Sequence, residues 1–145
     1  MSSEKEFDWD QYNSLTSQKI DAENQLNDIE FLNRELSQQI EELEYAKAIV
    51  KNERDNFKSI KKSVKTCIDD EKYEWEGTHC HKFHFNGRAL ESDNDTYYQS
   101  VDQLLDDIRD KITELENKKY ENEGLFLITK TMLNEIGNAF EKLFN

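Results

Sequence analysis

The chain has 145 residues, a net charge of −13, and equal shares, 35% each, of charged and hydrophobic residues. That apolar content suffices for a seam between helices but not for a thick globular core, so we expect no active site and no enzyme. The strong negative charge disfavours nucleic acids and anionic membrane surfaces as partners.

No apolar run approaches the roughly 18 residues that a membrane-spanning helix needs. The N-terminal residues are acidic and lack the basic and apolar regions of a signal peptide. We therefore expect a cytoplasmic protein, with export only by a route that reads no N-terminal signal. In that compartment Cys67 and Cys80 are expected to be free thiols.

The first arm, residues 5–73 or thereabouts, carries an apolar residue at every seventh position without a miss. The series is Leu15, Ala22, Ile29, Leu36, Leu43, Val50, Phe57 and Val64. Sustained heptads predict a helix with a long packing seam. A second series, three residues further on, is expected to widen the seam: Leu32, Ala46, Ile60 and Cys67, with Leu26, Ile40 and Ile68 beside it.

Trp75-Glu76-Gly77 lies near the centre of the chain, which has four glycines and no proline. Glycine tolerates the backbone conformations of sharp reversals. The sequence therefore predicts a single all-α domain over residues 1–145. It is a long antiparallel two-helix hairpin, coiled-coil-like, with its turn at 74–78.

The second arm, residues 79–123 or thereabouts, repeats the pattern less strictly. Its seam is predicted from Val101, Ile108 and Leu115, supported by Tyr97, Tyr98, Leu104, Leu105 and Ile112. Gly124 then predicts a kink or a helix end, because glycine in a helix costs about 1 kcal/mol relative to alanine. Residues 125–145 are expected to form an amphipathic C-terminal helix, either separate or as a bent continuation.

Charges support the antiparallel pairing. With a turn at 75–76, residue i faces roughly residue 151 minus i. Segment 47–65 holds seven bases and two acids, whereas its predicted partner segment 89–108 holds six acids and no base. Opposite charges across a helical seam set orientation and register. We expect ion pairs between these segments.

The other end of the hairpin lacks such a match, because residues 21–44 hold eight acids and one base. Spare apolar residues there indicate a partner-binding surface, although a merely solvated end fits equally well. The candidate partner-binding residues are Leu26, Phe31, Leu32, Phe126, Leu133, Ile136 and Phe140.

All three histidines, His79, His81 and His84, cluster near Cys80 and give a weak alternative of a structural metal site. Zinc sites draw ligands from two segments at recognised spacings, which this run lacks. We expect no metal, no cofactor and no catalytic residue, because no phosphate-binding loop or nucleophile motif is present.

The run Trp75-Glu76-Gly77-Thr78-His79-Cys80-His81-Lys82-Phe83 resembles the turn of WXG-type helical-hairpin proteins. In that pattern a small residue stands three positions after the glycine and an aromatic residue six after it. Length and arm pattern are most similar to the YwqH-like branch, linked to type VII (ESX-like) secretion in Gram-positive bacteria. The resemblance implies that Trp75 and Gly77 form the turn, with Cys80 and Phe83 packed beneath it.

The same resemblance implies a targeting factor or chaperone that binds the helical N-terminal domain of an LXG-type toxin, with a second small helical protein as a further partner. Exported relatives carry Tyr-x-x-x-Asp/Glu after their second helix, whereas here Tyr98 and Asp102 lie inside the arm. Export of this chain itself therefore stays open. Two alternatives also stay open: a self-assembling coiled coil, forming a homo-oligomer alone, and an immunity protein.

Overall fold

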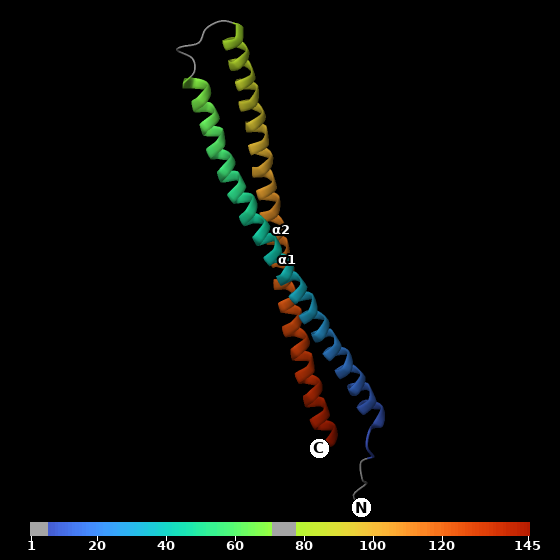
Figure 1. The fold of residues 1–145 in the computed structure, drawn as a ribbon. Coiled ribbons are helices and arrows are strands. Elements are labelled where there is room, and N and C mark those ends of the chain that lie inside the picture. The colour runs from blue at the N-terminus through green and yellow to red at the C-terminus, as the bar shows by residue number, and fades with distance from the viewer. Residues whose placement is uncertain (1–5, 71–77) are drawn as a thin grey trace, which may run out of the picture. The chain divides into compact units, whose positions relative to one another are not determined.

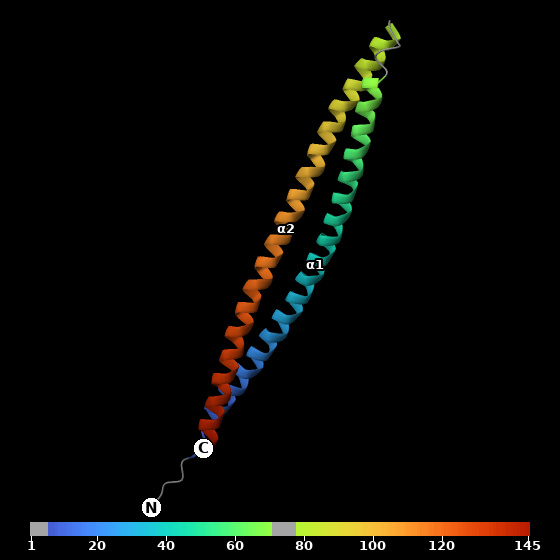
Figure 2. The same ribbon diagram turned by 90° about the vertical axis from the view of Figure 1, so that its left-hand side faces the viewer.

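Two long helices make up the computed structural model, which describes residues 6–70 and 78–145, with the backbone alone at 67–70, 78–81, 83 and 84. Helix α1 spans Trp9–Asp70 and helix α2 spans Thr78–Phe144. The helices pack against each other in opposite directions (Figures 1 and 2). The predicted all-α hairpin is confirmed, while the predicted turn residues Trp75 and Gly77 lie outside the described residues.

The chain divides into two compact units, each built from a piece of both helices. Unit 1 joins Met1–Ile40 to Glu114–Asn145, and unit 2 spans Glu41–Thr113.

Helix α1 begins at Trp9 because Asp8 caps it. The backbone N–H of Gln11 donates a hydrogen bond to Oδ1 of Asp8 over 3.0 Å, which satisfies one of the N–H groups that a helix start leaves unpaired. The ring of Phe7, just before the cap, packs on the ring of Tyr12 at 5.9 Å between centroids. Cap and ring contact together form a hydrophobic staple that fixes where the chain enters α1.

The predicted seven-residue series of α1 faces α2 in both units, where its members are buried or half-buried. The second series differs from the prediction. Leu32 and Ile60 are about half exposed, whereas Ala46 of that series and the predicted Leu26 and Ile40 are half-buried as expected. The half-buried positions that recur regularly follow the first series by four residues. They are Leu26, Asn33, Ile40, Lys47, Arg54 and Lys61.

In unit 2, ion pairs explain why basic residues lie at the seam while Ile60 is exposed. Nη1 of Arg54 lies 3.0 Å from Oδ1 of Asp102, and Lys61 pairs with Asp95. The expected pairing of the basic and acidic segments is confirmed, with residue numbers that add up to 156 rather than 151 in both pairs. Arg54 donates a hydrogen bond to Asp102, and this bond raises the pKa of Arg54 above its usual value. A charged side chain at the seam needs such a carboxylate beside it.

Helix α2 continues through Gly124 without a break, so of the two alternatives for residues 125–145 the continuation holds and the separate helix does not. Its seam is formed by two seven-residue series that stay in phase on both sides of the glycine. One runs from Val101 to Leu143 and the other from Tyr98 to Phe140, and their members are buried or half-buried. Gly124 itself is exposed, and a Cβ added to it would meet nothing within 4 Å. Packing on either side therefore outweighs the low helix propensity of one glycine.

The core of unit 1 consists of Leu15, Ala22 and Ile136, with Leu133, Ala139, Phe140 and Leu143 packed against it. Thr129 is buried as well, and its hydroxyl donates to the carbonyl oxygen of Leu125 over 2.8 Å. That bond removes the cost of burying an unpaired hydroxyl.

Aromatic rings close the end of unit 1 where the described chain begins and ends. The rings of Phe7 and Phe144 stack at 5.5 Å between centroids, and Tyr12 meets Phe140 edge-on at 5.8 Å. Such pairs contribute about 0.5–1.5 kcal/mol each beyond the area they bury. They tie the segment before α1 to the last turn of α2.

Unit 2 packs around Leu105 and Ile112, both almost fully buried. The rings of Phe57 and Tyr97 lie 4.7 Å apart. Over residues 6–70 and 78–145, neither helix offers a stretch apolar enough to cross a membrane.

Replacement of Asp8 by alanine is expected to destabilise the hairpin by about 1 kcal/mol, because it removes the cap of α1. Urea unfolding followed by circular dichroism measures this. Asp10→Ala serves as the control and should cost less. Asp10 also lies in the first turn of α1, but the capping bond is accepted by Asp8. An equal loss for both variants would contradict the capping role.

Replacement of Gly124 by alanine is expected to stabilise the hairpin by about 0.5–1 kcal/mol, since the helix is continuous there and the added Cβ meets no atom. Gly137→Ala, equally free of contacts, should act in the same direction. Thermal unfolding checks both. A lower melting temperature for Gly124→Ala would show that the glycine is needed for a bend.

Candidate helix-binding surface

An exposed apolar surface lies beside the seam of unit 1. It consists of Leu32 on α1 and of Leu125, Ile128 and Met132 on α2, and each of these side chains is 46–60% exposed. The three α2 residues are spaced three and four apart, which places them in one row along the helix. We call these four residues the apolar flank.

A hollow of about 300 Å³ opens on the same side of unit 1. Leu32, Leu36 and Gln39 of α1 line it together with Lys118, Glu121 and Asn122 of α2. Leu125 follows Glu121 by one helical turn and continues the same face. The hollow and the apolar flank together offer a groove in which the side chains of a third helix can interdigitate.

Acidic side chains border the apolar flank. Asp28 and Glu35 lie one turn before and after Leu32 on α1, and Glu121 and Glu135 bracket the row on α2. All four are exposed, and none forms an ion pair among the described residues. Lys118, the base at this border, lies 3.4 Å from Glu114. The electrostatic potential at the apolar flank is therefore negative.

Unit 2 has a comparable row on α2. Leu90, Tyr97 and Leu104 stand seven residues apart and are 47–54% exposed, and Ile60 of α1 is 57% exposed. Tyr97 and Leu104 therefore border the seam rather than fill it as predicted. Leu125 and Met132 belong to the same seven-residue series of α2, in which Lys111 and Lys118 separate them from Leu104. An apolar column next to the two seam columns is typical of helices that pack in bundles of more than two.

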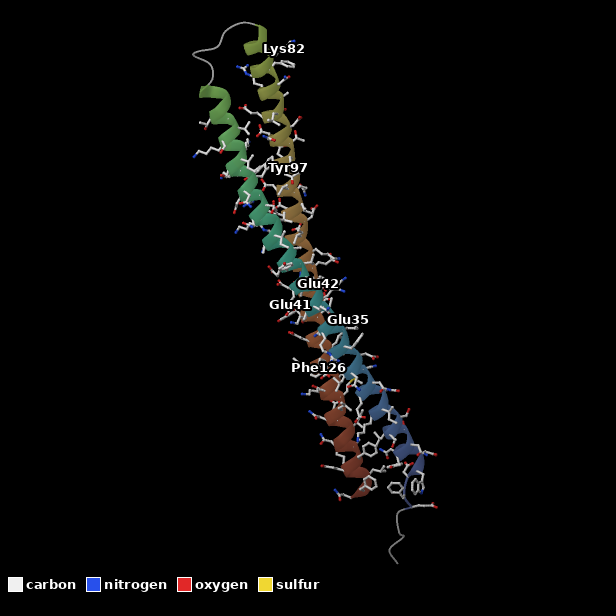
Figure 3. The ribbon with its side chains drawn as sticks, viewed as in Figure 1. Glu35, Glu41, Glu42, Lys82, Tyr97 and Phe126 are labelled. Carbon is white, nitrogen blue, oxygen red and sulfur yellow. The ribbon has the colours of Figure 1, made fainter. Side chains whose placement is uncertain are left out.

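A second groove, of about 570 Å³, opens elsewhere on unit 1 and shares no lining residue with the hollow beside Leu32. Ile29, Phe126 and Leu127 supply apolar walls, with Glu30, Arg34 and Glu123 also in the lining. Asn33 lines it as well, and its Oδ1 is buried without a hydrogen-bond partner among the described residues. Such an unpaired acceptor costs about 1–3 kcal/mol. We call this the Asn33 groove. Figure 3 labels Phe126, which lines it, and also Glu35, which belongs to α1 of the same unit but does not line the groove.

The predicted partner-binding residues fall into two groups. Phe31 and Leu32 are about half exposed and are available to a partner. The others face α1 or α2: Leu26 and Phe126 are half-buried at the seam, Leu133 and Phe140 pack on the core, and Ile136 belongs to the core. In this conformation these five contribute to the hairpin itself.

The turn motif and the histidine cluster remain predictions. Trp75 and Gly77 lie outside the described residues, and the side chains of Cys80, Phe83, His79, His81 and His84 lie outside the described part as well. Cys80 and Phe83 are placed only as members of the first turns of α2.

Comparison of the chain with protein-family models, with curated proteins and with solved structures finds no match.

Sequence reasoning missed Ile128 and Met132 as surface residues. Like seam residues, they are spaced three and four positions from other apolar residues. Spacing alone therefore does not tell whether they face α1 or solvent. The series 90, 97, 104, 125 and 132, read beside the two seam series, indicates a further apolar row that Lys111 and Lys118 divide into two stretches.

Substitutions on the apolar flank are expected to leave the hairpin intact, unlike those in the core. Ile128→Gln should change the free energy of unfolding by less than about 0.5 kcal/mol, whereas Ile136→Ala should cost about 2–4 kcal/mol through the cavity it leaves. Urea unfolding compares the two. A loss above about 1 kcal/mol for Ile128→Gln would mean that the flank already packs within the hairpin.

Proposed function

We propose that this chain is a non-enzymatic helical partner protein, which completes a larger helical bundle by binding a helix of another protein on its apolar flank. The observation that carries this proposal is the half-exposed row of Leu32, Leu125, Ile128 and Met132 beside the seam. Burial of such side chains stabilises a complex by about 1.5–3 kcal/mol for each that becomes fully buried.

The acidic border specifies the chemistry of the partner. A helix that presents an apolar stripe flanked by Lys or Arg matches the flank, because Asp28, Glu35, Glu121 and Glu135 are left without bases of their own. Two copies of this flank would instead bring acid against acid. Charge therefore favours a different protein over a second copy at this surface.

The chain does offer a basic face, but that face does not fit the apolar flank. Lys58, Lys61, Lys62 and Lys65 lie together on α1 in unit 2, accompanied there only by Asp55 and Ser59. No apolar side chain is among them to fill the hollow beside Leu32. Homo-oligomerisation through the flank is thus the weaker alternative.

The resemblance around Trp75-Glu76-Gly77 supports a more specific form of the proposal. The client is then the helical N-terminal domain of an LXG-type toxin, and the chain serves as targeting factor or chaperone for type VII secretion in a Gram-positive bacterium. In this form the protein is made in the cytoplasm and is exported, if at all, together with its partner by a route independent of a signal peptide.

Co-expression with the helical N-terminal domain of an LXG-type toxin encoded beside this chain tests the proposal. We expect a stable complex, and the double variant Leu32→Glu/Ile128→Glu should weaken it about 100-fold or more, because it places like charges in an apolar contact. Tyr120→Glu is the matched control, since Tyr120 is 77% exposed in the same unit but does not belong to the flank.

Three results would redirect the assignment. Binding of the toxin's C-terminal domain instead of its N-terminal one would favour an immunity protein. A homo-oligomer that the double variant dissociates would favour the self-assembling coiled coil. A complex that tolerates the double variant as well as Tyr120→Glu would exclude the apolar flank as the binding surface.

A further inference from the structure

Two carboxylates line the hollow beside Leu32 from opposite helices, Glu35 on α1 and Glu121 on α2. Both side chains are exposed, and neither forms an ion pair among the described residues. The base in the lining, Lys118, lies 3.4 Å from Glu114 of its own helix. The hairpin therefore leaves two like charges around one open hollow, and a cation supplied by a partner relieves their repulsion.

The Asn33 groove differs from the hollow in this respect. It too is lined by one glutamate from each helix, Glu30 and Glu123, but Arg34 of the chain itself lines the groove with them. The described residues that line the hollow beside Leu32 include no arginine. Of the two sites, the hollow is therefore the one that a guanidinium from a partner complements.

The other lining residues favour arginine over other side chains. Leu32 and Leu36 form an apolar wall on which the methylene stem of a long basic side chain can lie. Gln39 and Asn122 add two amide groups, whose oxygens accept hydrogen bonds. The five N–H donors of a guanidinium can bond several acceptors at once, whereas the ammonium of lysine is a compact point charge. An apolar side chain would take the carboxylates out of water without giving them a partner, which is costly.

We propose that the hollow beside Leu32 binds one arginine of the partner helix, whose guanidinium bridges Glu35 and Glu121. The methylene stem of this arginine packs on Leu32 and Leu36. The inference rests on the function proposed above and specifies it. The apolar flank supplies the contact area, and the arginine fixes the position of the partner helix along it, because paired charges at an interface set its register.

Glutamine variants test the arginine site in the complex of the full-length chain with the helical N-terminal domain of the toxin. Glu35→Gln/Glu121→Gln keeps the shape of both side chains and removes both charges. We expect it to weaken the complex about 10- to 100-fold at low salt, the range that hydrogen bonds to charged groups give. Glu30→Gln/Glu123→Gln is the matched control, because it removes two charges from the other groove of unit 1. Calorimetric titration measures both affinities, and circular dichroism verifies the fold of both variants.

Replacement of each arginine of the toxin domain by lysine, one at a time, identifies the residue that occupies the hollow. One such replacement should weaken binding to the native chain about tenfold but leave binding to Glu35→Gln/Glu121→Gln nearly unchanged. This coupling is expected only for groups in contact, since substitutions at distant sites add independently.

The outcomes separate this inference from the proposed function. If Leu32→Glu/Ile128→Glu breaks the complex while Glu35→Gln/Glu121→Gln binds as well as its control, the arginine site is overturned and the apolar flank stands. Absence of coupling to any arginine of the toxin domain would overturn the arginine site too. A native chain that binds no toxin domain would overturn the proposed function and this inference together.

Discussion

The seam between α1 and α2 is the constraint on which the rest of this molecule depends. Both helices present two columns of residues to it, each with a period of seven. Because a two-helix hairpin has no other interior, most side chains outside these columns are exposed. Packing at the seam therefore keeps α2 helical through Gly124. It also determines which apolar residues stay exposed.

The composition of the seam is unusual on α1, where one column is apolar throughout and the other contains Asn33, Lys47, Arg54 and Lys61. In unit 2 Arg54 and Lys61 reach carboxylates of α2, whereas Lys47 lies 3.7 Å from Glu44 of α1 itself. The aliphatic stems of these residues still cover apolar surface. In unit 1 Oδ1 of Asn33 has no hydrogen-bond partner among the residues that the structure describes. The same column thus holds ion pairs across the seam in unit 2 and a neutral polar side chain in unit 1.

The residues that α1 places at the seam also determine which apolar side chains stay exposed. Placing bases in the seam leaves Leu32 and Ile60 outside it, and on α2 a third column of apolar residues stays half exposed. A hairpin built for isolation would gain more from charged residues at those positions. The exposed apolar residues support the proposal that a helix of another protein packs on this hairpin, and the acidic border supports a basic partner helix. The link to secretion depends on the Trp75 motif alone.

The sequence by itself determined the helical hairpin, the apolar column of α1 and the ion pairing of its basic segment with α2. These features follow from local periodicity and from total charge, which need no knowledge of contacts. The same reasoning predicted Phe31 and Leu32 as candidate partner-binding residues. Only the tertiary structure decided which neighbour column of α1 meets α2, and hence that Leu125, Ile128 and Met132 are exposed while Ile136 is buried. Residues three and four positions beyond a seam residue lie on either side of it on a helix. Periodicity cannot choose between them, whereas the position of the second helix does.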